Sequence, residues 1–151
     1  LSRVAEGPCD ELAALTGRVG PQEAAERVRL GRVGDALARR TESRRDIDRA
    51  ADDLEILHRR GGRLVTPDDD EWPLLAFASF GGIPLRDKAE GRPPLALWVI
   101  GPRRLDDLAD RAAAIVGTRA CTGYGEHVAA ELSAGLAEQG VAVVSGGAYV
   151  L

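Results

Sequence analysis

The sequence is poor in aromatic residues and has no methionine. Aromatic residues make up 4% of its 151 residues, so Ala, Val and Leu must supply most of the core. Without a methionine, Leu1 is either an unusual start or a cut end. No apolar run approaches the roughly 18 residues needed to span a bilayer, and the start lacks the apolar stretch of a signal peptide. We therefore expect a cytoplasmic protein that does not cross a membrane.

Cysteine is also scarce. Cys9 and Cys121 lie far apart, without a Cys-x-x-Cys pair or a nearby histidine. This spacing argues against a disulfide framework and against a zinc site, and it fits a reducing compartment. We expect neither a metal nor another cofactor.

Positive charge is limited and comes almost entirely from arginine. Lys88 is the only lysine, and the formal net charge is −4, which is unfavourable for a nucleic-acid-binding protein. The charge is not evenly spread. Residues 1–60 hold 12 Arg against 12 Asp and Glu, whereas residues 61–151 hold 8 Lys and Arg against 12. A local basic pocket on an acidic chain therefore stays compatible with the composition.

Residues 1–62 are predicted to form a helical domain. One helix covers residues 9–15 and stops near Gly17 and Gly20, and a second covers residues 22–30 after Pro21. The strongest helical pattern runs from Thr41 to Arg60, where apolar residues recur every three or four positions before Gly61-Gly62. Its arginines alternate with acidic residues, which favours a solvated face crossed by ion pairs.

Residues 63–94 are interpreted as a linker, and residues 95–151 as the first half of a Rossmann-like domain. In the linker, residues 63–66 resemble a short strand, and Trp72 is expected to anchor the segment by packing. From Leu95 onward, apolar strands alternate with helices. Strands are predicted at residues 95–101, 113–117 and 141–144, with helices at 105–111 and 125–139. This order predicts an α/β fold whose parallel sheet is covered on both faces.

Two predicted strands end in glycine-rich loops, and these form the candidate site. Ligands of open parallel sheets bind outside the carboxyl ends of the strands. Glycines allow backbone N–H groups to approach an anion, a helix N-terminus adds positive potential, and an arginine fork suits phosphate. The candidate DNA- or phosphate-binding residues are Gly117, Thr118, Arg119, Gly123, Tyr124, Gly125, Ser145, Gly146 and Gly147. Tight turns without a ligand are the simpler explanation of the same glycines.

Other nucleotide sites and catalytic sites fit less well. Val128 stands where the dinucleotide fingerprint needs its third glycine, and the third strand ends in Ser-Gly-Gly instead of an acidic residue. The Gly-Lys-Ser/Thr ending of a P-loop is absent. His58 and His127 both look like ordinary helix residues, and Ser145 has no candidate base close in the sequence. The residues therefore predict a binding protein without catalytic residues.

These segments together resemble the DprA/Smf family of DNA-processing proteins. The resemblance rests on Ile115-Val116-Gly117-Thr118-Arg119, Tyr124-Gly125 and residues 143–148, and upstream on Trp72-Pro73-Leu74-Leu75 and residues 93–98. The arginine-rich and alanine-rich style is similar to the high-GC actinobacterial branch. The resemblance covers nearly the whole chain.

The resemblance implies a sterile-alpha-motif-like helical domain followed by an extended Rossmann domain. It also implies binding of single-stranded DNA, interaction with the RecA recombinase, a role in DNA uptake and natural transformation, and no established enzymatic activity. Arg119 matches the family's arginine that contacts DNA phosphate, and Gly117, Thr118, Ser145, Gly146 and Gly147 match the surrounding loops.

The end of the sequence departs from the family pattern. The family continues after the Tyr149 position with Gly-Ile-Asp and over a hundred further residues, whereas this sequence ends at Leu151. We therefore expect an N-terminal fragment truncated within the Rossmann domain, without the family's dimer surface. Two alternatives stay open. One is a nucleotide-processing enzyme of the lysine-decarboxylase-like Rossmann type, although its Pro-Gly-Gly-x-Gly-Thr segment is absent. The other is an inactive gene remnant.

Overall fold

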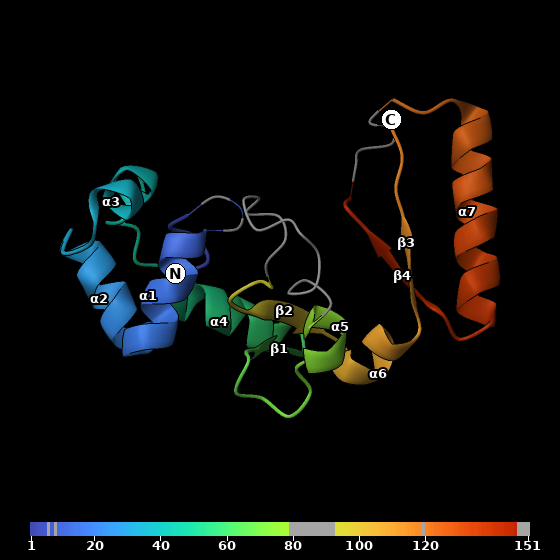
Figure 1. The fold of residues 1–151 in the computed structure, drawn as a ribbon. Coiled ribbons are helices and arrows are strands. Elements are labelled where there is room, and N and C mark those ends of the chain that lie inside the picture. Colours follow the sequence, from blue (N-terminus) through green and yellow to red (C-terminus); the bar gives the residue numbers. More distant parts are fainter. Residues whose placement is uncertain (6, 8, 79–92, 119, 148–151) are drawn as a thin grey trace. The chain divides into compact units, whose positions relative to one another are not determined.

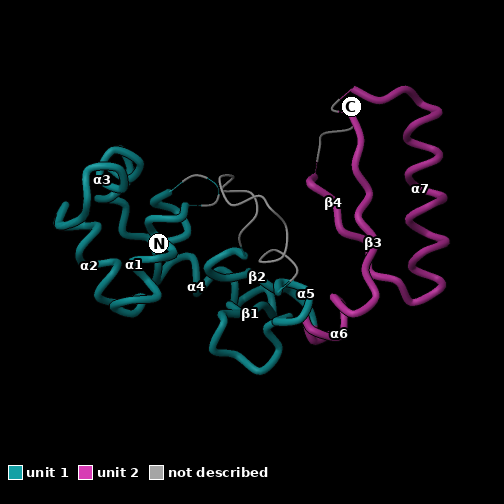
Figure 2. Tube along the Cα trace, in the orientation of Figure 1, with its two compact units in different colours: residues 1–101 teal, residues 102–151 magenta. Residues whose placement is uncertain are grey.

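The computed structural model describes the chain except residues 6, 8, 79–92, 119 and 148–151. It confirms the predicted α/β class, with helices first and two small sheets after them. The described residues form two compact units, residues 1–101 and residues 102–151 (Figure 2). The predicted domain boundaries at residues 62 and 94 stay predictions.

Four helices make up the first part of unit 1 (Figure 1). They are α1 (Asp10–Val19), α2 (Pro21–Arg29), α3 (Asp35–Thr41) and α4 (Ala50–Arg59). Gly20 separates α1 from α2 with a φ of 80°, a left-handed conformation that glycine adopts without steric cost. Pro21 then starts α2 at its first position, where no backbone N–H is needed. The predicted first two helices are therefore confirmed.

The core of unit 1 lies among α1, α2 and α3. The side chains of Leu12 and Leu15 from α1, Ala24 and Val28 from α2, and Leu37 from α3 are at most 5% exposed, and Cys9 completes the cluster. Helices α1 and α2 each contribute two residues three or four positions apart, which form an apolar stripe, and α3 contributes Leu37. These buried stripes hold the three helices around one centre.

The single helix predicted from Thr41 to Arg60 is wrong. The chain forms α3 up to Thr41, passes through turns, and starts α4 only at Ala50. Thr41 is buried, and its hydroxyl donates to the carbonyl of Leu37 at 2.8 Å within α3, so Thr41 ends one helix instead of starting another. Apolar residues at helical spacing misled the prediction. Ile47 is one of them, but it is 46% exposed and does not belong to a buried helix face.

The predicted solvated face of this region is confirmed on α4. Leu57 is its only buried residue. Two pairs of exposed charged side chains lie along it, Arg49 with Asp52 at 3.5 Å and Arg59 with Glu55 at 3.6 Å, whereas the side chain of Asp53 is 12% exposed and pairs with Arg3. The helix ends before Gly61, which has a φ of 65°.

Strand β2 (Leu97–Ile100) pairs antiparallel with β1 (Gly62–Val65). The predicted place of β2 in a parallel sheet with the later strands is therefore wrong. Gly62 lies opposite Ile100, and Val65, which is 1% exposed, lies opposite Leu97. Arg63 reinforces the pairing, because its guanidinium donates to the carbonyl of Gly101 at 2.6 Å, just beyond the end of β2.

Trp72 is a packing residue, as predicted. Its side chain is 8% exposed, and its ring lies 5.0 Å from the ring of Phe77 at an angle of 55°. Phe77 belongs to α5 (Leu74–Ala78), a short helix that the sequence pattern did not predict. Tilted aromatic pairs at this separation are favourable. The contact between Trp72 and Phe77 therefore fixes α5 next to the turn that follows β1.

Unit 2 contains α6 (Leu105–Asp110), β3 (Ala112–Ile115), α7 (Gly123–Glu138) and β4 (Ala142–Ser145). The two strands pair in parallel, and α7 connects them and runs alongside them (Figure 1). The predicted helices at 105–111 and 125–139 and the parallel pairing of these two strands are therefore confirmed.

The expectation that this sheet is covered on both faces is wrong. No described residue of unit 2 is buried, and Val144 of β4 is 54% exposed. Two four-residue strands and one long helix bring too little apolar surface together to enclose a core. Among the described residues, no helix is long and apolar enough to cross a membrane.

Candidate functional site

The candidate site lies at one edge of the β3–β4 sheet. In the parallel register, Ala112 lies opposite Ala142 and Ile115 lies opposite Ser145. The carboxyl ends of both strands therefore reach the same edge, which is also the edge from which the chain enters α7 (Figure 1). The two glycine-rich loops leave the sheet side by side, and this is the position where open parallel sheets bind ligands.

The loop after β3 is open to solvent. Val116 is 88% exposed, and Gly117 and Thr118 are exposed as well. The Thr118 hydroxyl accepts a hydrogen bond from the backbone N–H of Ala120 at 3.2 Å, and its own proton stays free to donate. Arg119, the expected phosphate contact, lies outside the described residues.

The loop after β4 is organised by its serine. The Ser145 hydroxyl accepts a hydrogen bond from the backbone N–H of Gly147 at 3.3 Å, and Gly147 has a φ of 63°. A Cβ at Gly146 would have no heavy atom within 4 Å, so this glycine leaves open space beside the backbone. An approaching anion can therefore come close to the main chain at this position.

Helix α7 begins beside these loops with the predicted Gly123-Tyr124-Gly125 segment. Thr122 caps the helix, because its side chain accepts from the N–H of Gly125 at 3.4 Å. Gly125 also packs closely, since a Cβ there would lie 3.2 Å from the Cβ of Cys121. Tyr124 is 78% exposed and offers a free ring face. The sequence prediction missed Thr122, although a threonine just before a helix is a recognised start signal.

The groups assembled at this edge are better suited to binding an anion than to catalysing a reaction. Backbone N–H groups, two hydroxyls and the N-terminal end of a 16-residue helix all favour negative charge. Glu126 in the first turn of α7 brings one competing negative charge. No group of three or more His, Cys, Asp or Glu side chains within the described parts of the chain could hold a metal ion. The structure brings Gly117, Thr118 and residues 145–147 to one edge, and their roles stay predictions.

Comparisons with known proteins show the family to which the chain belongs. The family described as DNA recombination-mediator protein A matches residues 63–150, which include both loops. Two curated relatives, named as putative DNA processing protein DprA in the CDC 1551 and H37Rv strains of Mycobacterium tuberculosis, are each 69% identical over 149 residues. The match covers 99% of this chain but spans only 38% of the relatives' length. No solved structure matches the chain. The chain therefore belongs to the DNA recombination-mediator protein A family.

Proposed function

We propose that this chain binds single-stranded DNA through its phosphates at the loops that follow β3 and β4. The observation that supports this most is the parallel register, in which Ile115 and Ser145 end their strands side by side. Both loops then expose glycine backbone and a hydroxyl at one edge of the sheet. Such an edge can follow a phosphate backbone without reading its bases.

Arg119 is the proposed cationic partner of the phosphate. It directly follows Thr118 in the sequence. An arginine gives a planar set of donors and keeps its charge at all physiological pH values, which suits a phosphate diester. The backbone N–H of Gly146 supplies a neutral donor from the second loop.

The proposed specificity is for flexible strands and not for a base sequence. Tyr124 is the exposed aromatic side chain at this edge among the described residues, and it can stack on any base. The phosphate contacts depend strongly on salt because they release counterions. Binding is thus expected to vary little with base sequence and to weaken steeply as salt rises.

The wider role follows from the family and is part of the proposal. As a member of a family of recombination mediators, the protein acts without enzymatic turnover, in the cytoplasm, on DNA taken up in natural transformation. It helps to load the RecA recombinase onto single strands. A homodimer, which the resemblance to the family implies, pairs two such sites and so increases the effective concentration of DNA at the second site.

An Arg119→Ala variant tests the site directly. We expect weaker binding of labelled oligothymidylate and a salt slope that is shallower by about 0.7 for each phosphate that the variant no longer neutralises. Gly146→Ala should also weaken binding while leaving the fold unchanged, because its new methyl group enters the space that the phosphate needs. Arg111→Ala is the matched control, since Arg111 directly precedes β3 and lies at the opposite end of that strand.

Titrations at several salt concentrations would measure the affinity and the slope. An unchanged slope in Arg119→Ala, or an equally weakened affinity in Arg111→Ala, would contradict the proposed site. Turnover of nucleoside monophosphates by the purified protein would instead favour a nucleotide-processing enzyme.

A further inference from the structure

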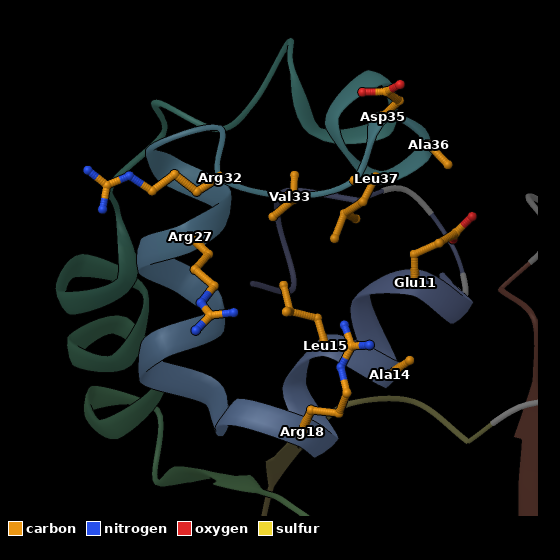
Figure 3. Close-up of a pocket in the computed structure, with 11 residues that line it drawn as sticks. Glu11, Ala14, Leu15, Arg18, Arg27, Arg32, Val33, Asp35, Ala36 and Leu37 are labelled. Carbon is orange, nitrogen blue, oxygen red and sulfur yellow. The ribbon is translucent and has the colours of Figure 1, made fainter.

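A groove of about 690 Å³ lies within unit 1, apart from the strand-end loops. One wall is a single face of α1, formed by residues 11, 14, 15 and 18. The opposite wall comes from Arg27 of α2 and from residues 32–37, which connect α2 to α3 and start α3 (Figure 3). None of the lining residues belongs to unit 2, so the groove can be considered by itself.

The middle of the groove is apolar and firmly held. Leu15 and Leu37 line it, and both belong to the buried core, with 5% and 3% of their surface exposed. Val33 packs partly buried against the same core. Because these side chains are fixed by core packing, the floor does not have to form when a ligand arrives. A preformed apolar floor reduces the entropy lost on binding.

The two ends of the groove carry opposite charges. The carboxylates of Glu11 and Asp35 lie on one side of the groove and the guanidinium of Arg27 lies on the opposite side, with the guanidinium of Arg18 between them beside Leu15 (Figure 3). Arg32 also lines the groove at the arginine end, but its side chain extends outward. In this view, Val33 and Leu37 lie between Arg27 and the two carboxylates.

Two of these four charged groups are paired within the described part of the chain, and two are not. Arg27 donates to Glu23 at 2.7 Å, and Glu11 lies 3.8 Å from Arg40 and accepts from the Cys9 thiol at 3.4 Å. Arg18 and Asp35 form no ion pair with any described residue. A ligand could therefore pair with Arg18 and with Asp35 without first breaking an internal ion pair.

The acidic end argues against a nucleic-acid strand as the occupant. Each nucleotide of a strand adds a negative charge, and those near Glu11 and Asp35 would be repelled. A peptide segment can instead place an acidic side chain, an apolar side chain and a basic side chain along one line. Such a segment matches the groove in charge at both ends and in polarity in the middle.

We propose that this groove binds a segment of a partner protein in which an apolar anchor stands between acidic and basic residues. The carboxylate of the segment pairs with Arg18 and Arg27, its apolar side chain packs on Leu15 and Leu37, and its cationic group pairs with Asp35. The proposal does not depend on the DNA site, because the two sites share no residue.

Synthetic peptides and the full chain test the proposal. The first peptide is Asp-Asp-Leu-Ala-Leu-Lys-Lys, the second replaces both leucines with serine, and the third replaces both lysines with glutamate. We expect the first to bind most tightly, with NMR amide shifts confined to residues 11–18 and 27–37. Serine substitution should weaken binding about tenfold or more, because the apolar anchor is removed. The all-acidic peptide should bind about fivefold more weakly than the first.

A charge reversal separates recognition from folding. Arg18→Glu should weaken binding of the first peptide about fivefold and favour a peptide with lysines in place of its aspartates. Arg29→Glu is the matched control, because Arg29 is an exposed residue of α2 that does not line the groove. Circular dichroism would verify that both variants keep their helices.

Several results would overturn the proposal. One is the absence of peptide binding at this groove, and another is an equally weakened affinity in Arg18→Glu and Arg29→Glu. Affinity that follows peptide net charge alone would also reject it. If oligothymidylate displaced the first peptide from residues 11–37, the groove would be a nucleic-acid site instead.

Discussion

At the scale of single residues, Arg63 connects three parts of unit 1. From β1, its guanidinium donates twice to the carboxylate of Glu71, at 2.5 Å each, and once to the carbonyl of Gly101. The Glu71 side chain is only 14% exposed, so this pair is better shielded from water than the Arg49–Asp52 and Arg59–Glu55 pairs. The residue thus links the turn before Trp72 to the end of β2.

We predict that Arg63→Ala lowers the free energy of unfolding by about 2–3 kcal/mol, since it leaves a half-buried carboxylate without its charged partner. Urea titration followed by tryptophan fluorescence would measure this, because Trp72 and Trp98 both lie in unit 1. Arg59→Ala is the control. Its pair with Glu55 is 68% exposed on each side, and removing it should change stability by less than about 0.5 kcal/mol. Equal effects of the two variants would show that the Arg63 interactions do not stabilise the fold.

At the scale of elements, the contact between α4 and β1 requires a glycine. A Cβ at Gly62 would lie 2.4 Å from Leu57 Cδ1 and 2.8 Å from the carbonyl oxygen of Val99. The leucine could rotate, but the Val99 oxygen belongs to the backbone of β2. Any larger residue at position 62 must therefore separate the two strands or move α4.

We predict that Gly62→Ala lowers the unfolding free energy by about 1–3 kcal/mol through this overpacking. Gly17→Ala provides the opposite case. Gly17 lies inside α1 with no heavy atom within 4 Å of an added Cβ, so alanine should stabilise the helix by about 0.5–1 kcal/mol. Thermal melts of both variants would show whether Gly62→Ala lowers and Gly17→Ala raises the stability of the protein. If Gly62→Ala left the unfolding free energy unchanged, β1 and β2 would be able to move apart without any loss of stability.

The elements also show which features the sequence could predict. Helices α1, α2 and α7 combine apolar spacing with glycine stops, and the prediction found all three. The interruption between α3 and α4 was missed because apolar spacing alone does not show whether a side chain such as Ile47 is buried. The pairing of β1 with β2 joins residues far apart in the chain, and no local signal marks such a pairing.

The candidate site was predictable in its position and not in its detail. Two apolar strands linked by one helix implied parallel pairing, which brings residues 117–118 and 145–147 to one edge. The Thr122 cap and the close packing of Gly125 on Cys121 depend on exact backbone geometry. The roles of the loop residues, Arg119 among them, stay predictions that the binding experiments must test.

At the scale of the whole molecule, the two units differ sharply in burial. Unit 1 encloses a core in which Ala24 is 0% and Leu12 is 2% exposed. In unit 2, no described residue is buried, and Leu132 of α7 is 51% exposed. Burial of apolar surface is the main favourable contribution to folding, so the two units should differ in local stability.

We predict that amide hydrogens in β3 and β4 exchange with solvent about 100-fold faster than those in α1 and α2, a difference of about 2.7 kcal/mol in opening free energy. Hydrogen exchange measured by mass spectrometry on the intact chain would resolve the units. Saturating oligothymidylate should slow exchange in residues 112–147 first. Equal protection of both units in the free chain would show that the sheet of unit 2 is stabilised by more than its exposed surfaces suggest.

The different exposure of the two cysteines has a practical consequence for spectroscopy. Cys9 is buried, with its thiol directed to Glu11, whereas Cys121 is partly exposed just before α7. A thiol-reactive fluorophore should therefore attach at Cys121 before it reaches Cys9. The label would stand beside the two strand-end loops without any engineered cysteine. The chain thus carries its own attachment point for an optical sensor of whatever occupies that edge.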